Sequence, residues 1–69
     1  MEVIILMLGY GAKLKELRGT KSQESVANDL GISVSALGMY ETEQRVPRDE
    51  IKIRLANYYK STVQAIFFE

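Results

Sequence analysis

The sequence predicts an all-α fold, a compact five-helix bundle that follows a short apolar N-terminal extension or strand. Apolar residues recur three or four positions apart in five successive segments, as on helices that bury one face. Polar caps, glycines or the single proline separate these segments, and one proline with five glycines leaves little room for many hairpins. We divide the chain into the extension, residues 1–8, and one domain, residues 9–69.

Each helical segment begins or ends at a residue suited to that place. Ser22, Ser33 and Thr62 can cap the N-termini of the second, third and fifth segments. Gly19 and Gly31 suit the left-handed conformation that ends a helix. The positions expected to face the core are Tyr10, Leu14, Leu17, Val26, Ala27, Leu30, Leu37, Tyr40, Ile51, Leu55, Ala56, Tyr59, Val63, Ile66 and Phe67.

The N-terminal extension contains the longest apolar run, Val3–Leu8, and shows no amphipathic period. Two interpretations stay open: an appendage without a structural role, or a strand that pairs with a partner chain or packs on the domain. The run is much shorter than the roughly 20 residues of a membrane span. Glu2 stands where a secretory signal has basic residues. We therefore expect a cytoplasmic protein without a membrane partner.

The composition excludes several kinds of chemistry. The chain has no Cys and no His, which removes disulfides, zinc sites of the Cys/His type, cysteine nucleophiles and imidazole catalysis. Its acidic residues show no paired spacing with a nucleophile or a metal. We expect no enzyme activity, no metal and no cofactor. Nine Lys and Arg balance nine Asp and Glu, so the net charge of zero provides no general attraction to nucleic acid.

The stretch Gln23–Thr42 combines two helical segments at a steep angle. Its connection, Gly31–Ser33, is too short to let the two helices pack antiparallel. The small Ala27 suits a close crossing, and Ile32 and Leu37 can fill the angle between the helices. Two helices joined by a turn of about three residues that contains Gly form a helix-turn-helix.

This stretch resembles the Cro/phage-repressor class of helix-turn-helix proteins, often called the Xre family. Residues 22–27 are similar to the second helix of that family. Residues 46–47, 55–56 and 62–67 look like its fourth and fifth helices. The resemblance covers residues 10–68 and implies a five-helix bundle that binds double-stranded DNA. The third helix, about 33–42, would enter the major groove, and the second would lie across the backbone.

The resemblance also implies the roles of individual residues at the DNA. The family's base-reading positions fall on Val34, Ser35 and Met39, and Gly38 and Thr42 share the same exposed face. The positions expected to contact phosphate, or to position the base-reading helix, are Arg18, Lys21, Ser22, Gln23 and Arg45. Backbone amides at the start of the second helix would add to the phosphate contact.

Three positions depart from the family's pattern. Val34 replaces a Gln of the lambda-type pattern, so Val34 and Met39 offer apolar contact, most plausibly to thymine methyl groups. Glu43 stands where a Gly is usual, and its carboxylate would repel a nearby phosphate. Lys60 also replaces a common Gly, so both positions are expected to be strained.

We expect a sequence-specific transcription regulator, a repressor, that acts as a homodimer on a near-palindromic operator. Two alternatives stay open. One is an antitoxin-type autoregulator that also binds a toxin protein. The other is a protein-interaction module that has kept the fold and lost DNA binding, which Glu43, the missing Gln and the zero net charge favour. The dimer interface could be the extension or the apolar residues 66–68.

Overall fold

A computed structural model describes residues 9–68 of the chain. These residues form a compact all-α bundle and contain no strand, which confirms the predicted fold class. The extension, residues 1–8, lies outside the described residues, as does Glu69. The helices are α2 (Tyr10–Arg18), α3 (Gln23–Leu30), α4 (Val34–Glu41), α5 (Asp49–Tyr58) and α6 (Val63–Phe67).

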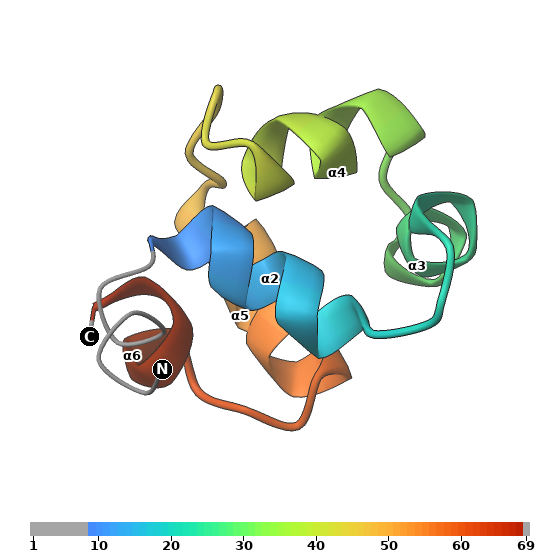
Figure 1. The fold of residues 1–69 in the computed structure, drawn as a ribbon. Helices are drawn as coiled ribbons and strands as arrows, with labels where there is room; N and C mark the ends of the chain where they lie inside the picture. Colours follow the sequence, from blue (N-terminus) through green and yellow to red (C-terminus); the bar gives the residue numbers. More distant parts are fainter. Residues whose placement is uncertain (1–8, 69) are drawn as a thin grey trace.

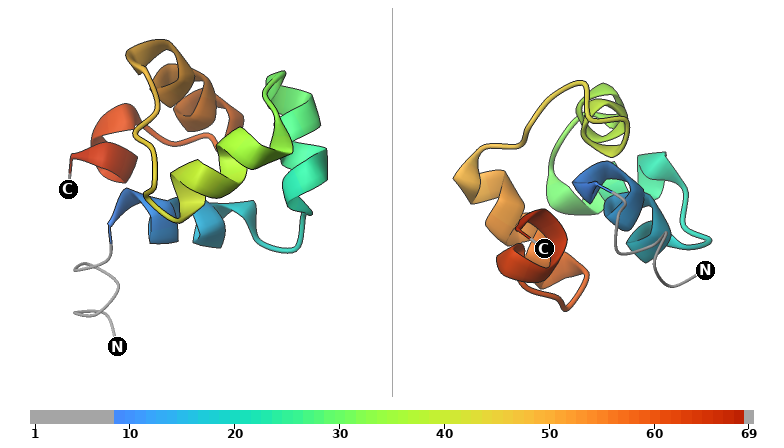
Figure 2. Two further views of the ribbon diagram at one scale, coloured as in Figure 1. Left: turned by 90° about the horizontal axis from the view of Figure 1, so that it is seen from above. Right: turned by 60° about the vertical axis from the view of Figure 1, so that its left-hand side comes forward.

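Helix α2 lies between two pairs of helices (Figures 1 and 2). On one side α3 and α4 pack on each other, and α4 also packs on α2. On the other side α5 packs on α6, and α6 contacts α2. The contact of α3 with α5 closes the bundle. Among the helices of residues 9–68, none packs on the far side of α4 (Figure 1).

The caps of the helices follow the predicted pattern except at Gly19, which ends α2 at φ 59° and ψ −127° and so lies outside the left-handed helical conformation predicted for it. The hydroxyl oxygens of Ser22, Ser33 and Thr62 each accept a hydrogen bond of 3.0 Å from the backbone N–H three residues later. These bonds satisfy amides that a helix N-terminus otherwise leaves unpaired. Gly31 ends α3 with a φ of 72°, and a Cβ there would meet nothing within 4 Å. The turn therefore needs glycine for its backbone conformation and not for space.

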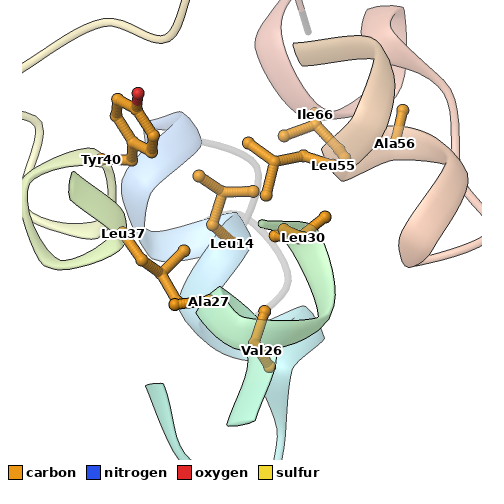
Figure 3. Packing of buried hydrophobic residues seen from close by; sticks show 9 residues of the cluster. All are labelled: Leu14, Val26, Ala27, Leu30, Leu37, Tyr40, Leu55, Ala56 and Ile66. Carbon is orange, nitrogen blue, oxygen red and sulfur yellow. The ribbon is translucent and has the colours of Figure 1, made fainter. Parts of the chain in front are cut away.

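One apolar core joins all five helices (Figure 3). Leu14 of α2 lies at the centre of the labelled side chains, between residues of α4 and residues of α5. Among residues 9–68, the nine residues of the hydrophobic core cluster are all among the predicted core positions. They are Leu14, Val26, Ala27, Leu30, Leu37, Tyr40, Leu55, Ala56 and Ile66.

The predicted apolar stripe of α2 is wrong at one position, since Leu17 is 41% exposed. The buried face of this helix runs through Gly11 and Leu14 to the half-buried Arg18. Gly11 is buried against the end of α4. A Cβ on Gly11 would lie 2.8 Å from Cγ of Glu43 and closer still to the backbone of Glu41. The glycine therefore lets α4 approach α2, which turns the buried face away from Leu17.

Candidate nucleic-acid interface

The five predicted base-reading residues lie together on α4 and its C-cap. Val34, Ser35 and Thr42 are exposed, and Gly38 and Met39 are half-buried. The buried face of the same helix carries Leu37, Tyr40 and Glu41. The Thr42 hydroxyl donates to the Gly38 carbonyl oxygen at 2.9 Å, which leaves its oxygen free to accept. Helical spacing thus turns one side of α4 to the core and presents the other side as a continuous surface. We call the five residues the α4 face.

The side chain of Gln23 is anchored beside this surface. Its Nε2 donates a hydrogen bond of 2.9 Å to Oε1 of Glu41. Its amide also lies over Gly38, since a Cβ on that glycine would be 3.8 Å from Nε2. The amide keeps one N–H and its carbonyl oxygen for other partners. The structure therefore links the start of α3 to the far end of α4 through one oriented side chain.

Glu41, which is only 4% exposed, has a role that the sequence pattern did not predict. Its carboxylate accepts hydrogen bonds from Nε of Arg18 at 2.7 Å and from Nη2 at 3.2 Å, besides the bond from Gln23. This pairing with Glu41 raises the pKa of the Arg18 guanidinium. One signal could have revealed the carboxylate, because Glu41 follows the core residue Leu37 by four residues and so lies one turn further along the same helix face.

Two predicted phosphate contacts have partners inside the protein. Arg18 holds Glu41 and also donates to the carbonyl oxygen of Lys21 at 2.8 Å. Lys21 donates to the Tyr58 hydroxyl at 3.0 Å, and that hydroxyl donates to Asp29 at 2.6 Å. The hydrogen bond to Tyr58 raises the pKa of the Lys21 ammonium. Phosphate contact by these two side chains stays a prediction, and it would compete with the internal bonds.

Glu43 has the strained backbone that the sequence analysis expected, with a φ of 61°. Its carboxylate is held by α2, because the Gly11 amide donates to Oε2 at 3.2 Å. The N-cap of α2, Gly9, provides no side-chain hydrogen bond, so Glu43 is the acceptor at this positive helix end. Glu43 therefore has a structural partner that the repulsion argument did not include. Lys60 likewise has a positive φ, of 54°.

The loop after α4 provides cations that are not engaged by the fold. Arg45 and Arg48 are exposed and make no side-chain hydrogen bond or ion pair within residues 9–68. Both line a hollow of about 260 Å³ beside Ile32 and Tyr40. The Tyr10 hydroxyl donates to the Arg45 carbonyl oxygen at 3.1 Å and so fixes the loop to α2. Ala36 and Tyr40 of α4 line the same hollow, so these two charges lie beside that helix.

Helices α3 and α4, their short glycine turn and the bundle around them define a helix-turn-helix protein. A helix-turn-helix family of the Cro/C1 type matches the chain over residues 14–66, and the chain belongs to this family. The family consists of DNA-binding transcription regulators, which is the class of this protein. No curated protein and no solved structure matches the chain significantly. Among the helices that the structure describes, none has the length and apolar character to cross a bilayer.

Proposed function

We propose that the protein is a sequence-specific repressor that binds double-stranded DNA as a homodimer in the cytoplasm. Helix α4 enters the major groove, and α3 lies across the sugar–phosphate backbone. The α4 face supports this proposal, because Val34, Ser35 and Thr42 are exposed there in a helix-turn-helix of this family, while the opposite side of α4 forms the core. We place DNA at the α4 face because the family consists of DNA-binding regulators.

We propose two kinds of contact within this interface. Val34, Ser35 and Met39 contact base edges, and Gly38 and Thr42 let the groove approach the helix backbone. Arg45 and Arg48 contact phosphates, together with the capped N-terminus of α3 at Ser22 and Gln23. Because Arg18 and Lys21 are tied to Glu41 and Tyr58, we assign them a smaller share of the binding than Arg45.

For the dimer we propose an interface at the C-terminal end of the described chain. Phe68 is among the exposed large apolar residues. Lys52 lies over the rings of Phe67 and Phe68, with its Nζ 5.5 Å from the Phe67 ring centroid and 5.2 Å from the Phe68 ring centroid. Two copies related by a two-fold axis would place two α4 helices in successive turns of the groove. A dimer through residues 1–8 is the alternative.

A second candidate is a protein-interaction module that no longer binds DNA, and one observation favours it. The α4 face carries no charged side chain and no amide, although both types dominate direct base recognition. An antitoxin that binds both its promoter and a toxin protein would need the DNA contacts as well as a further surface.

Salt dependence separates the two candidates. We would titrate the full chain against a labelled mixed-sequence duplex by fluorescence anisotropy between about 50 and 200 mM salt. A DNA-binding protein releases counterions, so the logarithm of the binding constant should fall linearly with the logarithm of salt concentration. Binding that is absent even at the lowest salt would contradict the proposal and favour the protein-interaction module.

A further inference from the structure

The hollow of about 260 Å³ beside Tyr40 lies between α4 and the start of α5. None of the five residues of the α4 face lines it. Apolar atoms come from Ile32, Ala36 and Ile51, Tyr40 lies among them, and Arg45 and Arg48 add positive charge. We call it the α4–α5 hollow. A lining of this kind suits a small molecule that combines an apolar body with a negative charge.

The hydroxyl of Tyr40 is a hydrogen-bonding group of this lining that the chain leaves unused. Tyr40 is only 5% exposed, and its hydroxyl makes no hydrogen bond among residues 9–68. The fully buried side-chain oxygen without a partner in this range belongs to Tyr59, so the Tyr40 oxygen is not sealed in the core. Figure 3 shows the hydroxyl turned away from Leu14 and Leu37. Because buried polar groups are normally hydrogen-bonded, a free hydroxyl at the wall of a hollow indicates a partner from outside the chain.

The N-terminus of α5 opens beside the same hollow. Arg48, at the N-cap, provides no side-chain hydrogen bond, and the first backbone bond runs from the Lys52 amide to the Arg48 carbonyl oxygen at 2.9 Å. The amides of residues 49–51 therefore find no acceptor within the described chain. The other four helices described here each receive a side-chain acceptor at this end. Free amides at the positive end of a ten-residue helix attract an anion.

The charges around the hollow favour a monoanion. Arg45 and Arg48 are not engaged by the fold, and the Arg45 backbone is fixed because its carbonyl oxygen accepts from the Tyr10 hydroxyl at 3.1 Å. Glu50 also lines the hollow, but its carboxylate lies 3.2 Å from the Arg54 guanidinium, which offsets its charge. Two guanidinium groups beside one neutralised carboxylate leave the hollow positive. The planar guanidinium matches a carboxylate in shape and charge.

We propose that the α4–α5 hollow binds a small organic acid, and that this ligand releases the protein from DNA. The apolar body lies against Ile32 and Ile51, and the carboxylate accepts from the Tyr40 hydroxyl and from the two arginines. A DNA phosphate supplies the charge but no apolar body for these walls. Binding of the acid stands on the hollow alone. Release of DNA rests on the proposed function, because the acid engages the two arginines that we assign to phosphates.

Benzoate is the probe for the binding half, added to the full chain without DNA. The shifts of backbone amides in nuclear magnetic resonance spectra should change mainly at residues 49–51 and around Tyr40, with a dissociation constant on the order of 1 mM for a ligand of this size. Benzamide has the ring without the charge, and inorganic phosphate has the charge without the ring. Each should bind at least about tenfold more weakly than benzoate. No shift at residues 49–51, or equal binding of either comparison compound, would overturn the proposal.

Tyr40→Phe removes the hydroxyl and keeps the ring in the core. Loss of one hydrogen bond should weaken benzoate binding by about fivefold. Affinity for DNA should stay within about twofold of the parent, because the hydroxyl is not part of the α4 face. Tyr58→Phe is the matched control, since it removes a hydroxyl at the other end of α5 and should leave benzoate binding unchanged. An unchanged benzoate affinity in Tyr40→Phe would overturn the site.

The release of DNA is tested with a labelled duplex in about 10 mM benzoate, against the same concentration of chloride. At about ten times its dissociation constant, benzoate should raise the apparent dissociation constant for DNA about tenfold, and only about threefold in Tyr40→Phe. An equal effect of chloride would overturn the release. If no duplex binds at any salt concentration, the proposed function and the release both fail, while the benzoate titration still decides whether the hollow binds an acid.

Discussion

Replacing Glu41 with Gln tests whether the buried carboxylate holds the helix-turn-helix to the rest of the bundle. The substitution keeps the shape of the side chain and removes its charge. The Arg18 guanidinium, whose side chain is only 17% exposed, would then face a neutral amide. Removing one partner of a buried pair costs about 3–5 kcal/mol. Since Arg18 keeps some contact with water, we expect the free energy of unfolding to fall by about 2–3 kcal/mol.

Urea unfolding followed by circular dichroism measures this change directly. For a small domain with a slope of about 1 kcal/mol per molar urea, the midpoint should fall by about 2–3 M. Such a loss is a large share of the roughly 3–10 kcal/mol expected for a domain of this size. The variant should remain folded without denaturant under stabilising conditions, so that its DNA binding can also be measured.

A matched control is Glu50→Gln, the same change in an exposed pair. Glu50 lies 3.2 Å from Arg54 one helical turn away, and its side chain is 75% exposed. This change should alter the free energy of unfolding by less than about 0.5 kcal/mol. Adding Arg18→Met to Glu41→Gln should restore part of the lost stability, because no uncompensated charge remains. Equal small effects of both Glu→Gln changes would refute the reasoning.

Three further predictions concern other parts of the molecule. Gly11→Ala should lower the free energy of unfolding by about 1–3 kcal/mol, because the added Cβ overpacks the contact with α4. Gly38→Ala should raise the free energy of unfolding by about 0.5–1 kcal/mol, because a Cβ there makes only ordinary contacts. Thermal unfolding of the two variants measures both changes. Burial raises the pKa of Tyr59 to about 12, and its hydroxyl has no partner among residues 9–68. The unfolded chain loses this proton near pH 10 and the folded chain near pH 12, so the free energy of unfolding should decline between pH 10 and pH 12. Tyr59→Phe should be more stable than the parent at neutral pH and should lose less stability between pH 10 and pH 12. An identical decline in both proteins would contradict the assignment to Tyr59. Arg45→Ala should weaken binding to all duplexes alike and reduce the salt slope by about one, whereas Ser35→Ala should change the preferred sequence; uniform losses from both changes in a binding titration would refute this division.

Most of the fold could be predicted from local signals. The caps at Ser22, Ser33 and Thr62 and the left-handed Gly31 depend on neighbouring residues only, and a short-range pattern records them. The core positions follow from helical periodicity in the same way. Leu17 was wrongly assigned because periodicity gives a stripe on an isolated helix, while the buried side of α2 depends on which helix approaches it. That approach is set by Gly11, whose importance appears only when α4 lies against it.

The candidate site was predictable in its positions and not in its internal bonds. The α4 face follows from the spacing of residues on one helix, and the structure places those five residues together. The sequence pattern treats the side chains of Arg18, Lys21 and Glu43 only as charges near phosphate. Their partners, Glu41, Tyr58 and the Gly11 amide, are 23, 37 and 32 residues away along the chain. Contacts over such separations depend on tertiary packing, which no short-range pattern contains.

The central claim is that the α4 face recognises a DNA sequence, and selection from a random duplex library tests it most directly. The purified full chain is mixed with the library at low salt, and the retained duplexes are sequenced over several rounds. The account predicts enrichment of a motif with two-fold symmetry, with half-sites about one helical turn apart, and loss of that enrichment when Val34 and Ser35 are both replaced by Ala. Retention without any motif, or no retained DNA, would contradict it.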